Sequence, residues 1–169
     1  MLKEISVCVK PANKTGKYVF LGLIGTALIL ACVIYSGAPY SGVLWTVALV
    51  FITAAIYVYN RHVVSEYYYE LRVDGGVESL VISMRVGKTV RTLARLELNA
   101  LTEVKRLDGK EYRKYKCEKG VYKYSYFPTM FPESVYLVSI RSEHESADLF
   151  IEVSEEFARE LESCIPPQL

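Results

Sequence analysis

The chain has 169 residues, of which 51% are hydrophobic and 23% charged, and its formal net charge at pH 7 is +1. The charges are unevenly distributed, because no Asp, Glu, Lys or Arg occurs between Lys17 and Arg61. A helix at the surface of a soluble protein keeps one polar face, so this composition argues against an ordinary soluble helical hairpin.

The first part of the chain predicts a membrane anchor. Residues 1–17 form a basic N-terminus with four lysines and one glutamate. The apolar segment 18–60 is interrupted only by SGAPYSG at 36–42, whose glycines, serines and proline are typical of a turn. About 20 apolar residues can cross the hydrocarbon core of a bilayer. We therefore expect a two-helix transmembrane hairpin with spans at about 18–36 and 42–60.

The flanking charges predict how this hairpin is oriented. Basic residues that flank a span stay in the cytoplasm, and lysines precede the first span while Arg61 and His62 follow the second. We expect a multi-pass protein of the inner (plasma) membrane with both termini in the cytoplasm. A cleaved signal peptide fits less well, because a second apolar segment follows the first so closely. Small residues indicate close packing of the two helices, namely Gly22, Gly25, Ala27, Ala54 and Ala55.

Residues 61–169 suffice for one compact cytoplasmic domain, and their first half predicts strands. Apolar and polar residues alternate, which is typical of half-buried strands. The turn signals are Asp74-Gly75-Gly76, Gly87-Lys88 and Asp108-Gly109. The predicted strands cover 67–73, 80–86, 90–98 and 101–107.

The second half of this domain adds strands and one helix. After a long basic loop, strands are predicted at 121–127, 134–140 and 147–153. About seven short antiparallel strands predict a barrel or a sandwich. Ser154 is a suitable N-cap for a closing helix, whose apolar stripe contains Phe157, Leu161 and Cys164 and which Pro166-Pro167 would end. We expect this stripe to close the mouth of a mainly-β barrel.

This order of elements resembles the bacterial PH-like (pleckstrin-homology-like) domains of small membrane proteins. The resemblance rests on YELRVDGGVESLVIS, on VGKTVRTLARLEL leading into LTEV, on the strand pair SVYLVSI and DLFIEV, and on the closing SEEFAREL. It covers roughly residues 66–165. The resemblance implies seven antiparallel strands closed by a C-terminal helix, on a protein with a two-span anchor.

The sequence offers no pattern typical of catalysis or of a cofactor. The two histidines, His62 and His144, have no partner at the spacing of metal ligands, and none of the four cysteines forms a CxxC pair. The sequence also contains no GxSxG hydrolase motif, no P-loop and no GxGxxG dinucleotide-binding motif. We therefore expect no enzyme activity, no cofactor and no metal site.

The charge pattern gives the candidate binding site. Residues 105–123 are rich in basic side chains interleaved with tyrosine, while residues 143–162 are mainly acidic. Such a stretch can bind anionic lipid or nucleic acid, and it can also be a solvated loop. The nearby anchor favours lipid over nucleic acid. The candidate contacts with a membrane surface or a partner are Lys105, Arg106, Lys110, Arg113, Lys114, Lys116, Lys119 and Lys123.

Two functions fit this sequence. The first is a membrane-anchored, non-enzymatic binding or scaffolding protein that presents a PH-like domain at the inner membrane surface to anionic lipid headgroups or a protein partner. The second is an accessory or assembly subunit of a larger membrane protein complex, in which the spans, a sheet edge or the closing helix contact other subunits.

Overall fold

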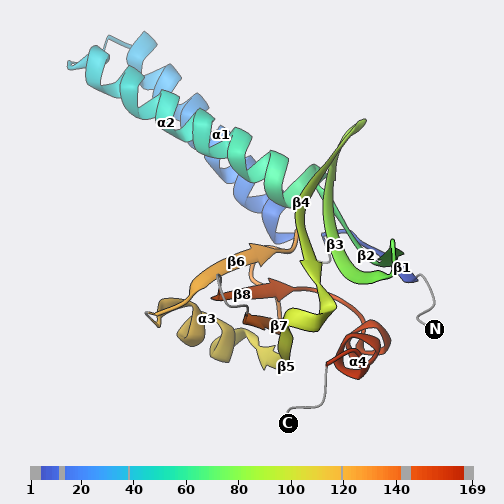
Figure 1. The fold of residues 1–169 in the computed structure, drawn as a ribbon. Coiled ribbons are helices and arrows are strands. Elements are labelled where there is room, and N and C mark those ends of the chain that lie inside the picture. Colours follow the sequence, from blue (N-terminus) through green and yellow to red (C-terminus); the bar gives the residue numbers. More distant parts are fainter. Residues whose placement is uncertain (1–4, 12–13, 38, 119, 142–145, 166–169) are drawn as a thin grey trace.

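A helical hairpin projects from a β-rich domain in the computed structural model, which describes residues 5–11, 14–37, 39–118, 120–141 and 146–165 (Figure 1). The hairpin contains α1 (Thr15–Tyr35) and α2 (Ser41–Tyr59), and a π-helical turn, η1 (Asn60–Val64), continues α2 toward the domain. The other described residues form strands, two further helices, a short 3-10 turn, η2 (Leu98–Ala100), and the loops between them.

Both helices of the hairpin are long and apolar enough to span a membrane. With 21 and 19 residues, α1 and α2 are about 31 and 29 Å long at about 1.5 Å per residue. The apolar 18-residue windows within α1 and within Ser41–Val64 have mean hydropathies of 2.3 and 2.0, yet only 6% and 17% of these windows are buried. Because so much apolar surface is exposed, the helices do not form the core of a soluble domain.

Small residues allow the two helices to approach, although not all of the predicted ones take part. Ala27 of α1 and Ala48 and Ala55 of α2 are buried in the hairpin. A Cβ atom on Gly22 or Gly25 would meet nothing within 4 Å, so the prediction that these glycines pack against the second helix is wrong. They face away from α2, because a helix places only one stripe of residues against its neighbour.

The first sheet contains a strand that the sequence analysis did not predict. Its order is β1-β2-β3-β4, with β1 (Ile5–Val9), β2 (Glu66–Asp74), β3 (Val77–Val86) and β4 (Thr89–Glu97), and every pair is antiparallel. Since β1 precedes α1 and β2 follows α2, their pairing brings both ends of the hairpin to the same side. The basic N-terminal segment thus contributes an edge strand to the β-rich domain.

The second sheet has the order β5-β7-β8-β6. Its strands are β5 (Leu101–Asp108), β6 (Tyr122–Tyr126), β7 (Ser134–Arg141) and β8 (Ser146–Ile151). The β5–β7 and β7–β8 pairs are antiparallel, whereas β6 and β8 are parallel.

The prediction of seven antiparallel strands in a closed barrel is therefore wrong in three respects. The described residues form eight strands in two separate four-stranded sheets, and one pair is parallel. All seven predicted strands are present within a few residues of their expected positions. The difference arises from pairing, because β6 adds to the far edge of β8 and β1 adds to β2.

The main hydrophobic core lies between the two sheets and is completed by α4 (Glu155–Ser163). Phe157 and Leu161 of α4 are buried in this core, as their spacing predicts, and Cys164 packs against it. The Ser154 hydroxyl accepts a hydrogen bond from the backbone N–H of Phe157, which confirms the predicted N-cap. The prolines expected to end the helix lie outside the described residues.

The other face of the second sheet is covered by a helix, α3 (Gly109–Cys117), where the sequence analysis predicted a loop. Its buried Tyr112 forms edge-to-face contacts with Phe127 and Phe150, with ring centroids 5.7 and 4.9 Å apart. The second sheet is thus buried on both faces, against the first sheet on one side and α3 on the other. This arrangement places the basic α3 near the foot of the hairpin.

Candidate functional site

A pocket of about 840 Å³ lies where the hairpin joins the β-rich domain. Three segments that are distant in the sequence form its walls: the end of α2 with η1, the helix α3, and the loop 127–133 between β6 and β7. The side chains that give it its chemical character are cationic or aromatic, namely Arg61, His62, Lys110, Arg113, Lys116, Tyr57, Tyr112, Phe127 and Phe131.

The first turn of α3 is fixed by its own capping residues. Asp108 accepts hydrogen bonds from the backbone N–H groups of Lys110 and Glu111, both at 2.7 Å, and the Glu111 side chain accepts one from the Asp108 backbone. The two bonds to Asp108 lower the pKa of its carboxyl group. Asp108 therefore lines the pocket as a carboxylate that is hydrogen-bonded to the backbone of the helix it caps.

Gly109 joins α3 to the loop 127–133. Its backbone N–H donates to the carbonyl oxygen of Glu133 at 2.8 Å, and a Cβ on Gly109 would lie 2.7 Å from the carbonyl oxygen of Pro132. A side chain at this position would thus push the loop away from the helix. Gly109 is the first helical residue after the cap Asp108, so the prediction of a simple Asp108-Gly109 turn is wrong.

The same loop has an unusual backbone conformation at its rim. Phe131 has a φ of 57°, in the left-handed region that costs free energy for a residue with a Cβ, and its side chain is 65% exposed. Pro132, which follows it, is buried. The loop thus holds a large aromatic side chain at the open edge of the pocket.

The hairpin contributes Arg61 and His62, and both are bonded to the β-rich domain. Arg61 donates to the Tyr57 hydroxyl at 3.1 Å and to the carbonyl oxygen of Ser125 at 3.2 Å. His62 donates from Nδ1 to the carbonyl oxygen of Pro128 at 2.7 Å, since a carbonyl can only accept. These bonds connect the end of the second span directly to β6 and the loop that follows it.

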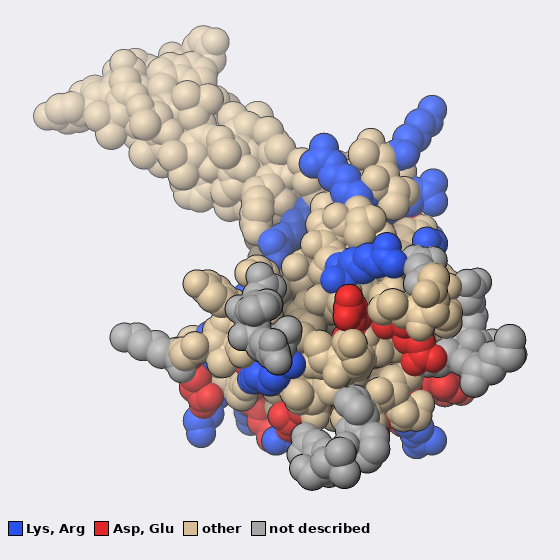
Figure 2. Space-filling view, in the orientation of Figure 1, with Lys and Arg blue, Asp and Glu red and all other residues tan. Residues whose placement is uncertain are grey.

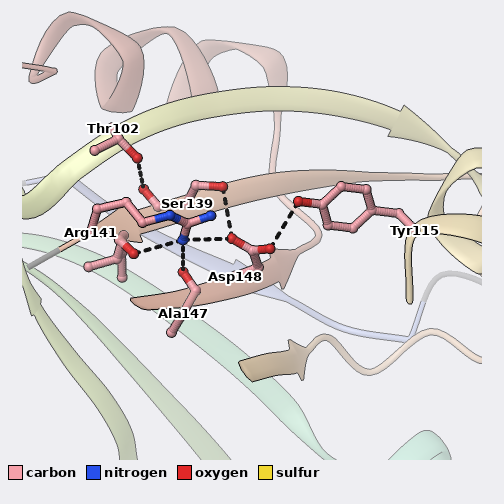
Figure 3. Close-up of polar contacts among 7 residues, drawn as sticks. Thr102, Tyr115, Ser139, Arg141, Ala147 and Asp148 are labelled. Atoms are coloured by element: carbon pink, nitrogen blue, oxygen red, sulfur yellow. Dashed lines mark hydrogen bonds and ion pairs between the residues drawn. The ribbon is translucent and has the colours of Figure 1, made fainter. Parts of the chain in front are cut away.

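A buried carboxylate holds α3 in place from the opposite side (Figure 3). Asp148 of β8 is fully buried and accepts hydrogen bonds from Ser139 at 3.0 Å, Arg141 at 3.0 Å and the Tyr115 hydroxyl of α3 at 2.9 Å. Burial, and secondarily the Asp148 carboxylate, raise the pKa of Tyr115, so its hydroxyl remains a donor. Because a buried carboxylate needs such donors, these contacts fix the position of the helix relative to the sheet.

The pocket carries an excess of positive charge, with four Lys or Arg side chains against the carboxylates of Asp108 and Glu133. Lys116 donates to the Tyr112 hydroxyl at 3.0 Å, and Arg113 uses its Nε to bond the carbonyl oxygen of Gly109 at 2.9 Å. Lys110, Arg113 and Lys116 are exposed and retain unused donors. Their arrangement suits an anionic group.

The eight candidate residues from the sequence do not form one surface. Lys110, Arg113 and Lys116 line the pocket, whereas Lys114 is exposed on α3 outside it. Lys119 lies outside the described residues.

The candidate residues on strands, Lys105, Arg106 and Lys123, lie outside the pocket as well. Lys105 is exposed on β5, and Arg106 pairs with Glu155 of α4 at 2.6 Å. Lys123 lies over the Tyr115 ring and donates to the carbonyl oxygens of Tyr115 and Glu118, so it stabilises the end of α3.

Sequence reasoning did not place Arg61, His62 and the loop 127–133 in the site, because they come from segments on either side of α3 and the first sheet. In the sequence alone, Pro128 and Pro132 of this loop indicate only a break between two strands. The capping pattern Asp108…Glu111 was the available signal for α3.

Comparison with known proteins does not assign the chain to a family: neither a family model nor a curated protein matches it. Among the described residues, no group of three or more His, Cys, Asp or Glu side chains could hold a metal ion. The candidate function therefore rests on the pocket itself.

Proposed function

We propose that this chain is a membrane-anchored, non-enzymatic binding protein that presents a divergent PH-like domain at the cytoplasmic surface of the inner membrane. The observation that carries the proposal is the cationic pocket at the foot of a helix long and apolar enough to span a membrane. Two sheets with a closing helix agree with the proposed relationship to PH-like domains, while the parallel β6–β8 pair marks the divergence.

The proposed orientation follows from the charges at both ends of the hairpin. Lys14 and Lys17 lie at the start of α1, Arg61 lies in η1, and the described part of the hairpin between Lys17 and Arg61 carries no Lys, Arg, Asp or Glu. Because β1 pairs with β2, the N-terminal strand and the domain lie on the same side of the membrane in any orientation. The positive flanks favour the cytoplasmic side.

The proposed ligand carries a phosphate or a similar anion. Lys110, Arg113 and Lys116 supply donors for such a group, and an Arg side chain can bond two oxygens at once. The exposed aromatic rings of Tyr57 and Phe131 form the side of the pocket where apolar parts of a ligand would lie. A phospholipid headgroup at the inner leaflet and a free soluble phosphate share this chemistry.

The polar contacts of the pocket hold its side chains in fixed positions, which supports a binding role. The side chain of Asp108 caps α3, His62 donates to a backbone carbonyl, and the Lys116 ammonium donates to Tyr112. The Ser125 and Tyr112 hydroxyls are hydrogen-bonded to each other at 3.1 Å, and Lys116 donates to Tyr112, so these pocket side chains also hold one another in place. The residues are arranged to hold an anion in a fixed position.

The test uses the full chain, because β1 precedes the helices and an excised domain would lose an edge strand. The protein is reconstituted in nanodiscs of zwitterionic lipid, zwitterionic lipid with added inorganic phosphate, or anionic phosphatidylglycerol. Hydrogen–deuterium exchange of α3 and the loop 127–133 is then measured. Slower exchange only with phosphatidylglycerol indicates a lipid headgroup, and slower exchange with inorganic phosphate indicates a soluble ligand.

Matched charge variants make this test specific. Lys110→Gln/Arg113→Gln should lower the apparent affinity for the anion about 30-fold, because each charge contributes about 1 kcal/mol. The protection of α3 and the loop 127–133 should then require a correspondingly higher anion concentration. Lys105→Gln/Lys114→Gln removes the same charge outside the pocket and should leave protection almost unchanged. Identical exchange in all three conditions would refute the proposed function.

The alternative of an accessory subunit is favoured by one observation, the outer edge of β6. Among the described residues this strand pairs with β8 alone, and its Tyr122 and Tyr124 side chains are 76% and 46% exposed. Open strand edges and exposed tyrosines are common at protein interfaces. Stoichiometric copurification of another protein in mild detergent, lost with Tyr122→Ser/Tyr124→Ser, would favour this alternative.

A further inference from the structure

A second positively charged surface lies at the turn between β3 and β4. The register pairs Arg85 of β3 with Glu66, the first residue of β2, which follows η1 by two positions. The turn Gly87-Lys88 therefore lies at the end of the first sheet where the second span enters the domain. Figure 1 shows this turn extending on the side of the domain from which the helices project.

The charged residues of this hairpin are all basic between residues 79 and 96. Residues 79–96 contain no Asp or Glu and include four basic residues, Arg85, Lys88, Arg91 and Arg95. Figure 2 shows Lys and Arg side chains gathered on this part of the domain beside the uncharged helices, while acidic side chains lie farther from the helices. Such a separation of charge is complementary to an anionic surface on the side of the helices.

The tip combines these charges with exposed apolar side chains. Val90 is the second residue after the turn and is 59% exposed, and it pairs across the hairpin with Arg85. Arg85 is held by the carbonyl oxygen of Gly87 and the Tyr68 hydroxyl, whereas neither Lys88 nor Arg91 has a polar partner among the described residues. An exposed valine between two unpaired cations suits the boundary between lipid headgroups and acyl chains.

We propose that the β3–β4 tip, residues 86–91, contacts the membrane that the chain's own helices cross. Lys88 and Arg91 bind the phosphates of anionic phospholipids, and Val90 enters the headgroup layer. This contact is independent of the pocket, because it lies on the first sheet and uses none of the pocket residues. Together with the anchor, it would fix the orientation of the domain relative to the bilayer.

The experiment places one spin label at a time on the full chain, with the four native cysteines replaced. One label is attached at Val90→Cys. Its matched control is attached at Val77→Cys, an exposed valine at the opposite end of the same hairpin. Collision with a water-soluble relaxation agent is measured in nanodiscs of zwitterionic lipid and of phosphatidylglycerol.

We expect the label at Val90 to become shielded from the water-soluble agent in phosphatidylglycerol and the label at Val77 to remain accessible in both lipids. Adding Lys88→Gln/Arg91→Gln should reduce the ratio of membrane-bound to free β3–β4 tip about 30-fold. Each basic residue near an anionic leaflet contributes about 1 kcal/mol, and two residues are removed. Lys105→Gln/Lys114→Gln should leave the shielding unchanged.

Two results would overturn this inference. One is equal water accessibility at Val90 and Val77 in anionic nanodiscs. The other is shielding of Val90 that is the same in zwitterionic lipid and insensitive to Lys88→Gln/Arg91→Gln, since anionic headgroups would then have no part in it. Neither result depends on exchange in α3, so the proposed function and this contact can fail separately.

Discussion

The position of α3 depends on one hydrogen bond that can be removed with little other change. Tyr115→Phe deletes the hydroxyl that donates to the buried Asp148 at 2.9 Å, but it keeps the ring that packs edge-to-face on Phe150 and lies beneath Lys123. A hydrogen bond to a charged group contributes about 1.5–3 kcal/mol. We therefore expect the β-rich domain to lose about 1.5–3 kcal/mol of its free energy of unfolding.

The complete Asp148 carboxylate should contribute more to the free energy of unfolding than the single hydrogen bond from Tyr115. Asp148→Ala leaves three donors without their acceptor, and the side chains of Ser139 and Tyr115 are at least partly buried. Breaking a buried ion pair costs about 3–5 kcal/mol, and the 38% exposure of Arg141 places the expected loss near the lower value, because water can solvate its free guanidinium. Such a loss is a large fraction of the roughly 5–15 kcal/mol of a typical domain.

The assay is pulse proteolysis of the full chain in mild detergent across a urea gradient, combined with hydrogen exchange of α3. Tyr122→Phe is the matched control, because its hydroxyl belongs to a side chain that is 76% exposed. The Tyr115→Phe/Asp148→Ala double variant should lose less stability than the sum of the single changes. Equal midpoints for Tyr115→Phe and Tyr122→Phe, with unchanged exchange in α3, would refute the reasoning.

Three further predictions concern the core, the pH dependence and the topology. Phe157→Ala should cost about 3–5 kcal/mol in urea unfolding because it opens a cavity between the sheets, while the exposed Glu162→Ala should cost little; equal losses would contradict the described core. Burial raises the pKa of Glu152, so folding holds its proton more tightly and stability falls as pH rises through the raised pKa; Glu152→Gln should reduce this fall, and parallel stability–pH curves would argue against it. In intact cells, a single Cys at Ser41 should react with an impermeant reagent, and labelling at Lys114 instead would reverse the proposed topology.

The sequence alone determined the elements whose signals are local. A long uncharged segment with a polar turn indicates two helices, because their composition leaves no polar face for water. Alternation along the chain located seven strands, and the spacing of Phe157 and Leu161 located the buried stripe of α4. Each of these patterns arises within a few residues, so it does not depend on what the segment later packs against.

The helix α3 has a local signal in the sequence, but tertiary contacts hold it in place. Its nine residues are mainly polar and basic, so hydrophobic periodicity is weak, and the capping pattern Asp108…Glu111 coincides with the turn signal Asp108-Gly109. The aromatic contacts of Tyr112 with Phe127 and Phe150 secure the helix, and they join parts of the chain that only the fold brings together.

Only the tertiary structure decided which strands pair and what surrounds the pocket. β1 joins β2 across the entire hairpin, and β6 lies parallel to β8, so two sheets form instead of one closed barrel. Pairing between distant strands depends on register and on competing edges, which the pattern within a strand does not specify. The pocket is likewise formed by η1, α3 and the loop 127–133, whose nearness to one another results from the packing of both sheets beneath the hairpin.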